Sequence, residues 1–174
     1  DLLELGAGSG VMAAVLLEEL ARRDALPHRY FILDVSADLR QRQRETLAAT
    51  VPQLLERVEW LDRLPDELEG LILANEVLDA LPVERFVMRG GAVRALGVAW
   101  QGGGPVWSEA PATGRLEAAV RHLEREAGAQ WPEGYTSEIN VDLGDWIAAV
   151  ARVPHLGNLR LRPADAGHAV DVFG

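Results

Sequence analysis

The sequence contains no cysteine, which excludes disulfide bonds and thiolate-bound metals. It contains no lysine either, and all 17 basic residues are arginine, an imbalance typical of GC-rich bacterial genomes. The histidines are too scattered along the chain to predict a cluster of metal ligands: His28, His122, His155 and His168. We therefore expect a bacterial protein without a metal cofactor.

Long apolar runs and net positive charge are also missing. The longest apolar run, Val11–Leu17, is far shorter than the ~18 residues of a membrane-spanning helix, and the chain does not open like a secretion signal. A formal net charge of -10 argues against a phosphate-binding surface and hence against nucleic acid, although an acidic surface can attract a basic protein. We expect a cytoplasmic protein with no membrane insertion, and its oligomeric state stays open.

Strand and helix patterns alternate over the first half of the chain. Apolar residues at helical spacing predict helices over 11–23 and 37–49, and Ser36 can cap the second helix. Short runs rich in strand-forming residues lie between and after them. They predict the strands of a parallel, doubly wound sheet: 1–5, 30–35, 58–61 and 70–75. The last two are nearly continuous in apolar character, which predicts that they are buried on both faces.

After Pro82 the pattern changes. Residues 85–88 and 92–100 have strand character and flank Gly90-Gly91, which predicts an antiparallel hairpin that 105–109 can extend. Apolar stripes then predict two core-facing helices: Leu116, Val120 and Leu123 within 114–127, and further on Leu143, Ile147 and Val150.

These elements together predict one α/β domain over 1–174, whose sheet is mostly parallel with an antiparallel hairpin insertion. With 174 residues, 48% of them hydrophobic, the chain suffices for one ordinary core. We expect residues 1–82 to form a cofactor-binding half, 83–137 a hairpin and helix excursion, and 138–174 a closing helix and strands.

Three glycines, Gly6, Gly8 and Gly10, lie between the first strand and the first helix. Without side chains they let the backbone turn sharply and leave helix amides free for a ligand, although tight packing alone can also explain such a turn. The third glycine falls one position too early for the dinucleotide fingerprint, which would need glycine where Val11 stands. The spacing therefore indicates a nucleotide-like ligand of another class.

Acidic residues accompany this turn. Glu4 comes just before it and would repel a diphosphate, but favours the ammonium group of a methionine moiety. Asp34 ends the second strand, where its carboxylate can bind both hydroxyls of a ribose. Asp62 follows the third strand and can bind the amine of adenine, with Leu61 or Trp60 against the ring, or it is a solvated loop acid. Together these residues predict S-adenosylmethionine as the cofactor.

The segment 75–82, Asn-Glu-Val-Leu-Asp-Ala-Leu-Pro, follows the fourth strand. It brings an amide, Asn75, and two carboxylates, Glu76 and Asp79, to the edge where ligands bind in open α/β sheets. Taken singly, Asn75 and Glu76 could start a helix and Asp79 could be a solvated acid. As a group they predict the site of the accepting substrate.

The segment 75–82 resembles the MidA-like methyltransferase family, and so do residues 4–10, residues 33–40 and the pair Gln43-Arg44. The resemblance covers about 3–86 and, more loosely, 135–140, where Glu138 takes a family-like acidic position. It implies a Rossmann-like class I methyltransferase sheet, S-adenosylhomocysteine as product and a protein substrate such as arginine. Because family members are much longer, we expect this sequence to be part of a longer chain. The residues expected to bind the cofactor are Glu4, Gly6, Ala7, Gly8, Gly10, Asp34, Val35, Leu61, Asp62 and Asn75.

The expected reaction is a direct displacement, with Glu76 and either Asp79 or Glu138 clamping a guanidinium acceptor. Two alternatives stay open. One is a catalytically inactive methyltransferase fold that serves as an assembly factor. The other is an NAD-dependent oxidoreductase, which the glycine spacing and Glu4 disfavour.

Overall fold

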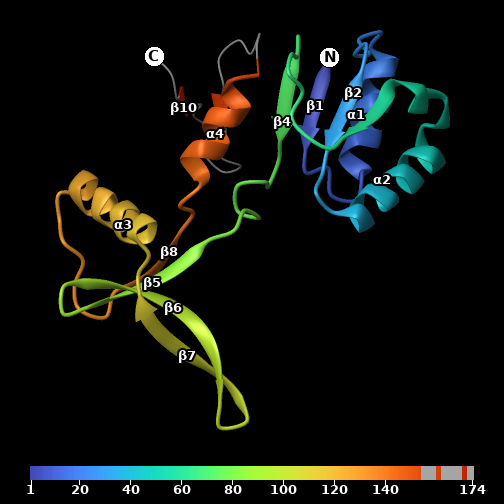
Figure 1. The fold of residues 1–174 in the computed structure, drawn as a ribbon. Helices are drawn as coiled ribbons and strands as arrows, with labels where there is room; N and C mark the ends of the chain where they lie inside the picture. Colours follow the sequence, from blue (N-terminus) through green and yellow to red (C-terminus); the bar gives the residue numbers. More distant parts are fainter. Residues whose placement is uncertain (154–159, 162–169, 172–174) are drawn as a thin grey trace. The chain divides into compact units, whose positions relative to one another are not determined.

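The structure is a computed structural model that describes residues 1–153, 160–161 and 170–171. Its contacts divide the chain into two compact units, Asp1–Asp79 with Ile147–Gly174, and Ala80–Trp146 (Figure 1). Most of the expected closing segment after 153 lies outside the described residues, except for the short antiparallel pair of β9 (Arg160–Leu161) and β10 (Val170–Asp171). The expectation of a single domain stays a prediction.

The first unit is built on a four-stranded parallel sheet. Its strand order is β3-β2-β1-β4, and helices α1 and α2 connect β1 to β2 and β2 to β3 (Figure 1). This confirms the mostly parallel α/β sheet. The elements are β1 (Leu2–Leu5), α1 (Val11–Arg22), β2 (Tyr30–Leu33), α2 (Ala37–Thr50), a 3-10 helix (Pro52–Arg57), β3 (Val58–Leu61) and β4 (Leu71–Ala74).

Helix α2 starts where the sequence predicts, because the Ser36 hydroxyl accepts a hydrogen bond from the Leu39 amide at 3.3 Å. One face of the sheet packs against the helices, and its core includes Leu2, Ala13, Leu17, Tyr30, Ile32 and Leu47. The expectation of burial on both faces is wrong for β4, where Leu71 is 58% exposed. β4 is the edge strand of this sheet, and among the described residues no strand pairs with its free edge.

The second unit contains a separate antiparallel sheet of order β7-β6-β5-β8, which confirms the predicted hairpin. β6 pairs with β5 only as far as Ala95 and continues with β7 as a two-stranded ribbon on which Trp100 and Trp107 are exposed (Figure 1). Strand β8 was not predicted. The elements are β5 (Glu84–Arg89), β6 (Ala92–Gln101), β7 (Gly104–Pro111), α3 (Gly114–Ala127) and β8 (Thr136–Ile139), and α4 (Leu143–Ala151) follows.

Helix α3 has the predicted bounds and buries Leu116 and Val120 against Phe86 and Met88. The prediction for Leu123 is wrong, because its side chain is 41% exposed. The buried stripe runs through positions 116, 120 and 124, and its third position is a glutamate that hydrogen bonds cover rather than apolar contacts. None of the described helices is long and apolar enough to cross a membrane.

Candidate functional site

Four sequence-predicted positions meet at one edge of the parallel sheet. The strands are in register at their ends, with Leu5 opposite both Leu33 and Ala74, and Leu33 opposite Leu61. The residues that follow these strands therefore share the carboxyl edge, where α/β sheets bind ligands. The Gly6 amide also donates to the Leu33 carbonyl at 2.9 Å, which joins the turn to the end of β2. The positions gathered in this way are Gly6, Asp34, Asp62 and Asn75.

The glycine turn serves two different physical needs. Gly8 and Gly10 both have positive φ, 53° and 82°. A Cβ added at Gly10 would lie 2.9 Å from the Cα of Gln43, so helix α2 packs too closely on the turn for any side chain there. A Cβ at Gly8 would meet no atom within 4 Å. The space at Gly8 is therefore open to a ligand, whereas Gly10 is required for packing.

Asp34 is held in one orientation at the end of β2. It is 8% exposed, and it accepts hydrogen bonds from the Ser36 amide at 2.9 Å and from Gln43 Nε2 at 2.8 Å. These bonds use one lone pair on each carboxylate oxygen and leave acceptor capacity on both. A fixed carboxylate with remaining lone pairs can bind a pair of vicinal hydroxyls.

Gln43 is the site residue that sequence reasoning missed as a functional group. Its side chain is fully buried and also contacts the Gly8 carbonyl, through Nε2 at 3.0 Å, and the Trp60 indole, through Oε1 at 3.0 Å. A signal was present, because Leu39, Gln43 and Leu47 are spaced four residues apart on one face of α2. A polar residue inside a buried stripe indicates a specific hydrogen-bonding role.

Glu4 lies inside the sheet rather than in the turn itself. It is fully buried on the sheet face that packs against α1 and α2, and one carboxylate oxygen accepts a hydrogen bond from the Tyr30 hydroxyl at 2.7 Å. Its other oxygen, Oε1, has no hydrogen-bond partner among the described residues. Burial raises the pKa of Glu4, partly offset by the Tyr30 bond, and burial beside Glu4 raises the pKa of Tyr30.

The residues after β2 and β3 are more exposed. Val35 is fully exposed, and Asp62 makes an ion pair at 2.6 Å with Arg40 while its side chain is 88% exposed. Trp60 is half-buried between the Gln43 amide and the Arg44 guanidinium, whose central carbon lies 4.5 Å from the ring centroid. An aromatic ring held in this way has the flat surface that an adenine could use.

The segment after β4 lies against the glycine turn. A Cβ added at Gly6 would be 3.2 Å from Cγ2 of Val77, so this segment passes close beside the turn. Asn75, Glu76 and Asp79 are all exposed, and Glu76 has a φ of 53°, in the left-handed region that disfavours side chains. The structure therefore brings Asn75 to the edge that carries the turn and packs Val77 against it, with Glu76 and Asp79 exposed in the same segment.

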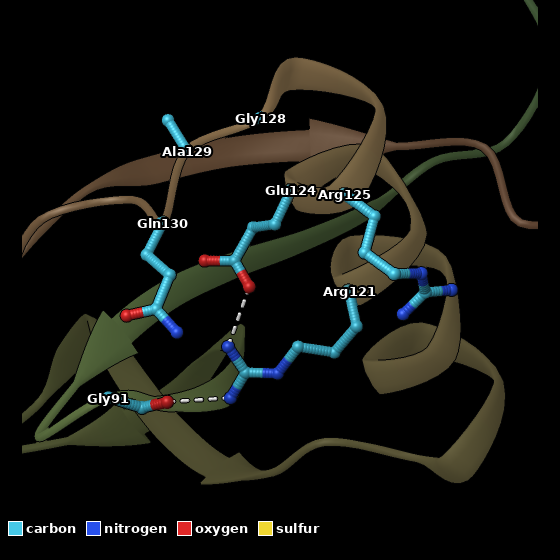
Figure 2. Close-up of a pocket in the computed structure, with 7 residues that line it drawn as sticks. All are labelled: Gly91, Arg121, Glu124, Arg125, Gly128, Ala129 and Gln130. Carbon is cyan, nitrogen blue, oxygen red and sulfur yellow. Dashed lines mark hydrogen bonds and ion pairs between the residues drawn. The ribbon is translucent and has the colours of Figure 1, made fainter.

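Glu138 belongs to the second unit, on β8, where its carboxylate lies 4.0 Å from the Arg85 guanidinium across the sheet. The same unit contains an open pocket of about 490 Å³ between the β5–β6 turn and the end of α3 (Figure 2). None of the sequence-predicted site residues lines this pocket.

Figure 2 shows that two of the charged side chains in this pocket, Arg121 and Glu124, are paired with each other. Arg121 bonds to Glu124 at 2.7 Å and to the Gly91 carbonyl at 2.6 Å. The bond from Arg121 and a second from the Trp131 amide lower the pKa of Glu124. This cluster fastens α3 to the hairpin and fills a structural role.

The parallel sheet, its glycine turn and the acids at its carboxyl edge define a class of α/β proteins that bind a nucleotide-like cofactor. Residues 1–159 match the family described as "Putative S-adenosyl-L-methionine-dependent methyltransferase", and the chain belongs to this family. S-adenosylmethionine is the cofactor of that family.

Two solved structures from Burkholderia thailandensis are similar to this chain. One, described as a "likely methyl transferase" bound to S-adenosyl-homocysteine, is 38% identical with a TM-score of 0.73, and the match covers 87% of this chain and 38% of that chain. The other is the native structure of an uncharacterized protein, 38% identical with a TM-score of 0.75, covering 87% of this chain and 40% of that one. The chain thus spans less than half the length of these proteins. A comparison with curated proteins gives no match.

Proposed function

We propose that this chain is the cofactor-binding part of a MidA-like class I methyltransferase, with a Rossmann-like sheet, that methylates a protein side chain such as arginine. The observation that carries the proposal is an open glycine turn and a fixed carboxylate at one sheet edge, with a buried carboxylate just inside β1 whose Oε1 has no partner among the described residues: Gly8, Asp34 and Glu4.

The residues present fit S-adenosylmethionine. The unpartnered Oε1 of Glu4 suits the ammonium of the methionine moiety, because a buried carboxylate gains most from a cationic partner. Asp34 suits the ribose hydroxyls, and Trp60 and Leu61 provide apolar surface beside an adenine, with Asp62 near its amine. When bound, the cofactor supplies an electrophilic methyl group that an acceptor lone pair displaces from sulfur, leaving S-adenosylhomocysteine.

The acceptor would lie beside the segment after β4. Glu76 and Asp79 are exposed there and can hold a cationic acceptor and take hydrogen bonds from its nitrogens, which orients one nitrogen toward the methyl carbon. As the new N–C bond forms, that nitrogen loses a proton to one of the two carboxylates. A guanidinium fits two carboxylates because it offers five donors in a planar fork.

The decisive experiment incubates the full-length protein with methyl-labelled S-adenosylmethionine and host lysate. A labelled protein band that is absent with Glu76→Gln supports the proposal, and the site of label identifies the acceptor. If cofactor binds but no lysate protein is labelled, the chain is an inactive assembly factor. A thermal shift with NAD and none with S-adenosylhomocysteine would establish the oxidoreductase alternative instead.

A further inference from the structure

The amide of Gln43 joins three segments that are far apart in the sequence. It reaches the glycine turn at Gly8, the end of β2 at Asp34 and strand β3 at Trp60. All three bonds are between 2.8 and 3.0 Å, and the side chain is fully buried. No other described side chain bonds to both the turn and the carboxylate that ends β2.

The chemistry of the partners allows only one orientation of this amide. The indole nitrogen of Trp60 is solely a donor and must face Oε1, while the Gly8 carbonyl and the Asp34 carboxylate are acceptors and must face the NH₂ group. Rotating the amide by 180° would therefore break all three bonds. Gln43 thus acts as a rigid connector, because its backbone is also packed against Gly10.

We propose that Gln43 is a positioning residue that fixes the Asp34 carboxylate for the ribose hydroxyls and holds the Gly8 carbonyl away from the ligand. This inference rests on the proposed cofactor site. Without Gln43, only the Ser36 amide restrains Asp34, and the carboxylate is free to rotate about its terminal bond. With the Gly8 carbonyl bonded to Gln43, the Ser9 N–H points in the opposite direction, because C=O and N–H are anti to each other across a trans peptide bond.

The same amide also sets the orientation of Trp60. Its indole N–H is bonded to Oε1, and the Arg44 guanidinium covers one side of the ring. A change at Gln43 therefore disturbs the turn, the ribose carboxylate and the aromatic surface together, although Gln43 itself touches no substrate. That coupling distinguishes a positioning residue from a residue that only fills space.

The test compares full-length wild type with Gln43→Met, which keeps the length of the side chain but cannot donate to Asp34 or accept from Trp60. Gln41→Met is the matched control, because Gln41 lies on the exposed side of the same helix and bonds only to Glu45. Calorimetry measures the Kd of S-adenosylhomocysteine and of its 2′,3′-dideoxy analogue for each protein. The ratio of the two Kd values reports the ribose contacts alone, since unfolding lowers the number of active sites and leaves the ratio unchanged.

In wild type and Gln41→Met we expect loss of the hydroxyls to weaken binding by roughly 10- to 100-fold. In Gln43→Met we expect that ratio to fall to within about 3-fold, because a mobile carboxylate no longer distinguishes the two ligands. Gln43→Glu is the second variant: it keeps the shape and the acceptor for Trp60 but opposes a carboxylate to Asp34, so its ratio should fall in the same way.

Three outcomes separate this inference from the proposed function. If the full-length wild type does not bind S-adenosylhomocysteine, the proposed function is wrong. If the wild type binds it but does not distinguish the dideoxy analogue, or if both Gln43 variants keep the wild-type ratio, the positioning role is wrong and the proposed function stands. A lowered ratio in both Gln43 variants with a normal ratio in Gln41→Met establishes the positioning role.

Discussion

Replacing Glu4 by Gln should stabilise the empty protein and weaken cofactor binding at the same time. Glu4 is fully buried, burial raises its pKa, and its Oε1 atom has no partner among the described residues. Ionising it inside the protein is therefore unfavourable until a cation arrives. Glutamine keeps an acceptor for the Tyr30 hydroxyl and removes the charge.

The pH dependence of stability shows why Glu4→Gln should stabilise the protein without ligand. Because the pKa of Glu4 is raised on folding, the folded protein holds its proton at pH values where the unfolded chain has lost it. Wild-type stability therefore falls as pH rises from the ordinary carboxyl pKa through the raised one, and it stays lower above that window. Glu4→Gln lacks this loss, so we expect its stability to change less across that window and to exceed that of the wild type at pH 8.

The second effect is the loss of a charge-assisted hydrogen bond to the ammonium of the ligand, which contributes roughly 1.5–3 kcal/mol. We expect the affinity for S-adenosylhomocysteine to fall by roughly 10- to 100-fold. An analogue without the amino group should bind both proteins about equally. In the wild type, affinity should also increase as pH rises through the raised pKa of Glu4, because the ionised carboxylate binds the cation.

Denaturant unfolding without ligand and calorimetry with both ligands measure the two effects on full-length protein. Glu59→Gln is the matched control, because Glu59 is exposed on strand β3 of the same sheet and should leave both quantities unchanged. The reasoning is refuted if Glu4→Gln is less stable than the wild type at pH 8, or if it binds S-adenosylhomocysteine as tightly.

Three further substitutions test other parts of the structure. Gly10→Ala should lower the free energy of unfolding, measured with denaturant, by about 2–4 kcal/mol, because Gly10 has a positive φ and contacts α2. Gly8→Ala should lower the same free energy by only about 1–2 kcal/mol, and its main effect should be weaker cofactor binding in calorimetry. Glu76→Gln should abolish labelled methyl transfer and leave cofactor Kd nearly unchanged, so a large loss of binding contradicts its assignment to the acceptor. Glu124→Ala should lower the unfolding midpoint by removing the bonds to Arg121 and the Trp131 amide, and an unchanged midpoint would contradict that structural role.

The regular elements could be predicted because their signals are local. Helix α2 has its capping Ser36 and α3 its apolar stripe, and both begin where the sequence places them. Strand β8 escaped prediction because Thr136–Ile139 is short and polar, and its extended form depends on pairing with β5, about fifty positions earlier in the chain. The exposure of β4 could not be predicted either, since a strand's apolar character does not reveal how many neighbours cover it.

The candidate site could likewise be predicted only in part. The glycine turn and the acids were visible as residue types at strand ends, and the register of the strands brings their positions to one edge. For Gln43 the sequence offered only its place in the stripe of Leu39 and Leu47, and it could not reveal the role itself, which comes from partners on three other segments. The role of Tyr30 was overlooked because its partner also lies on another segment: only the structure of the sheet reveals that its hydroxyl reaches Glu4.

The structure also strengthens the distinction between S-adenosylmethionine and NAD beyond glycine spacing. A solvated acid before the turn would discriminate little, because water screens its charge. Glu4 is instead fully buried with an unpartnered oxygen, so its interaction with a ligand is weakly screened. A diphosphate there adds like-charge repulsion to an existing desolvation penalty, whereas an ammonium removes that penalty. Under the proposed function, the burial that destabilises the empty protein is thus what favours a cofactor with an ammonium group.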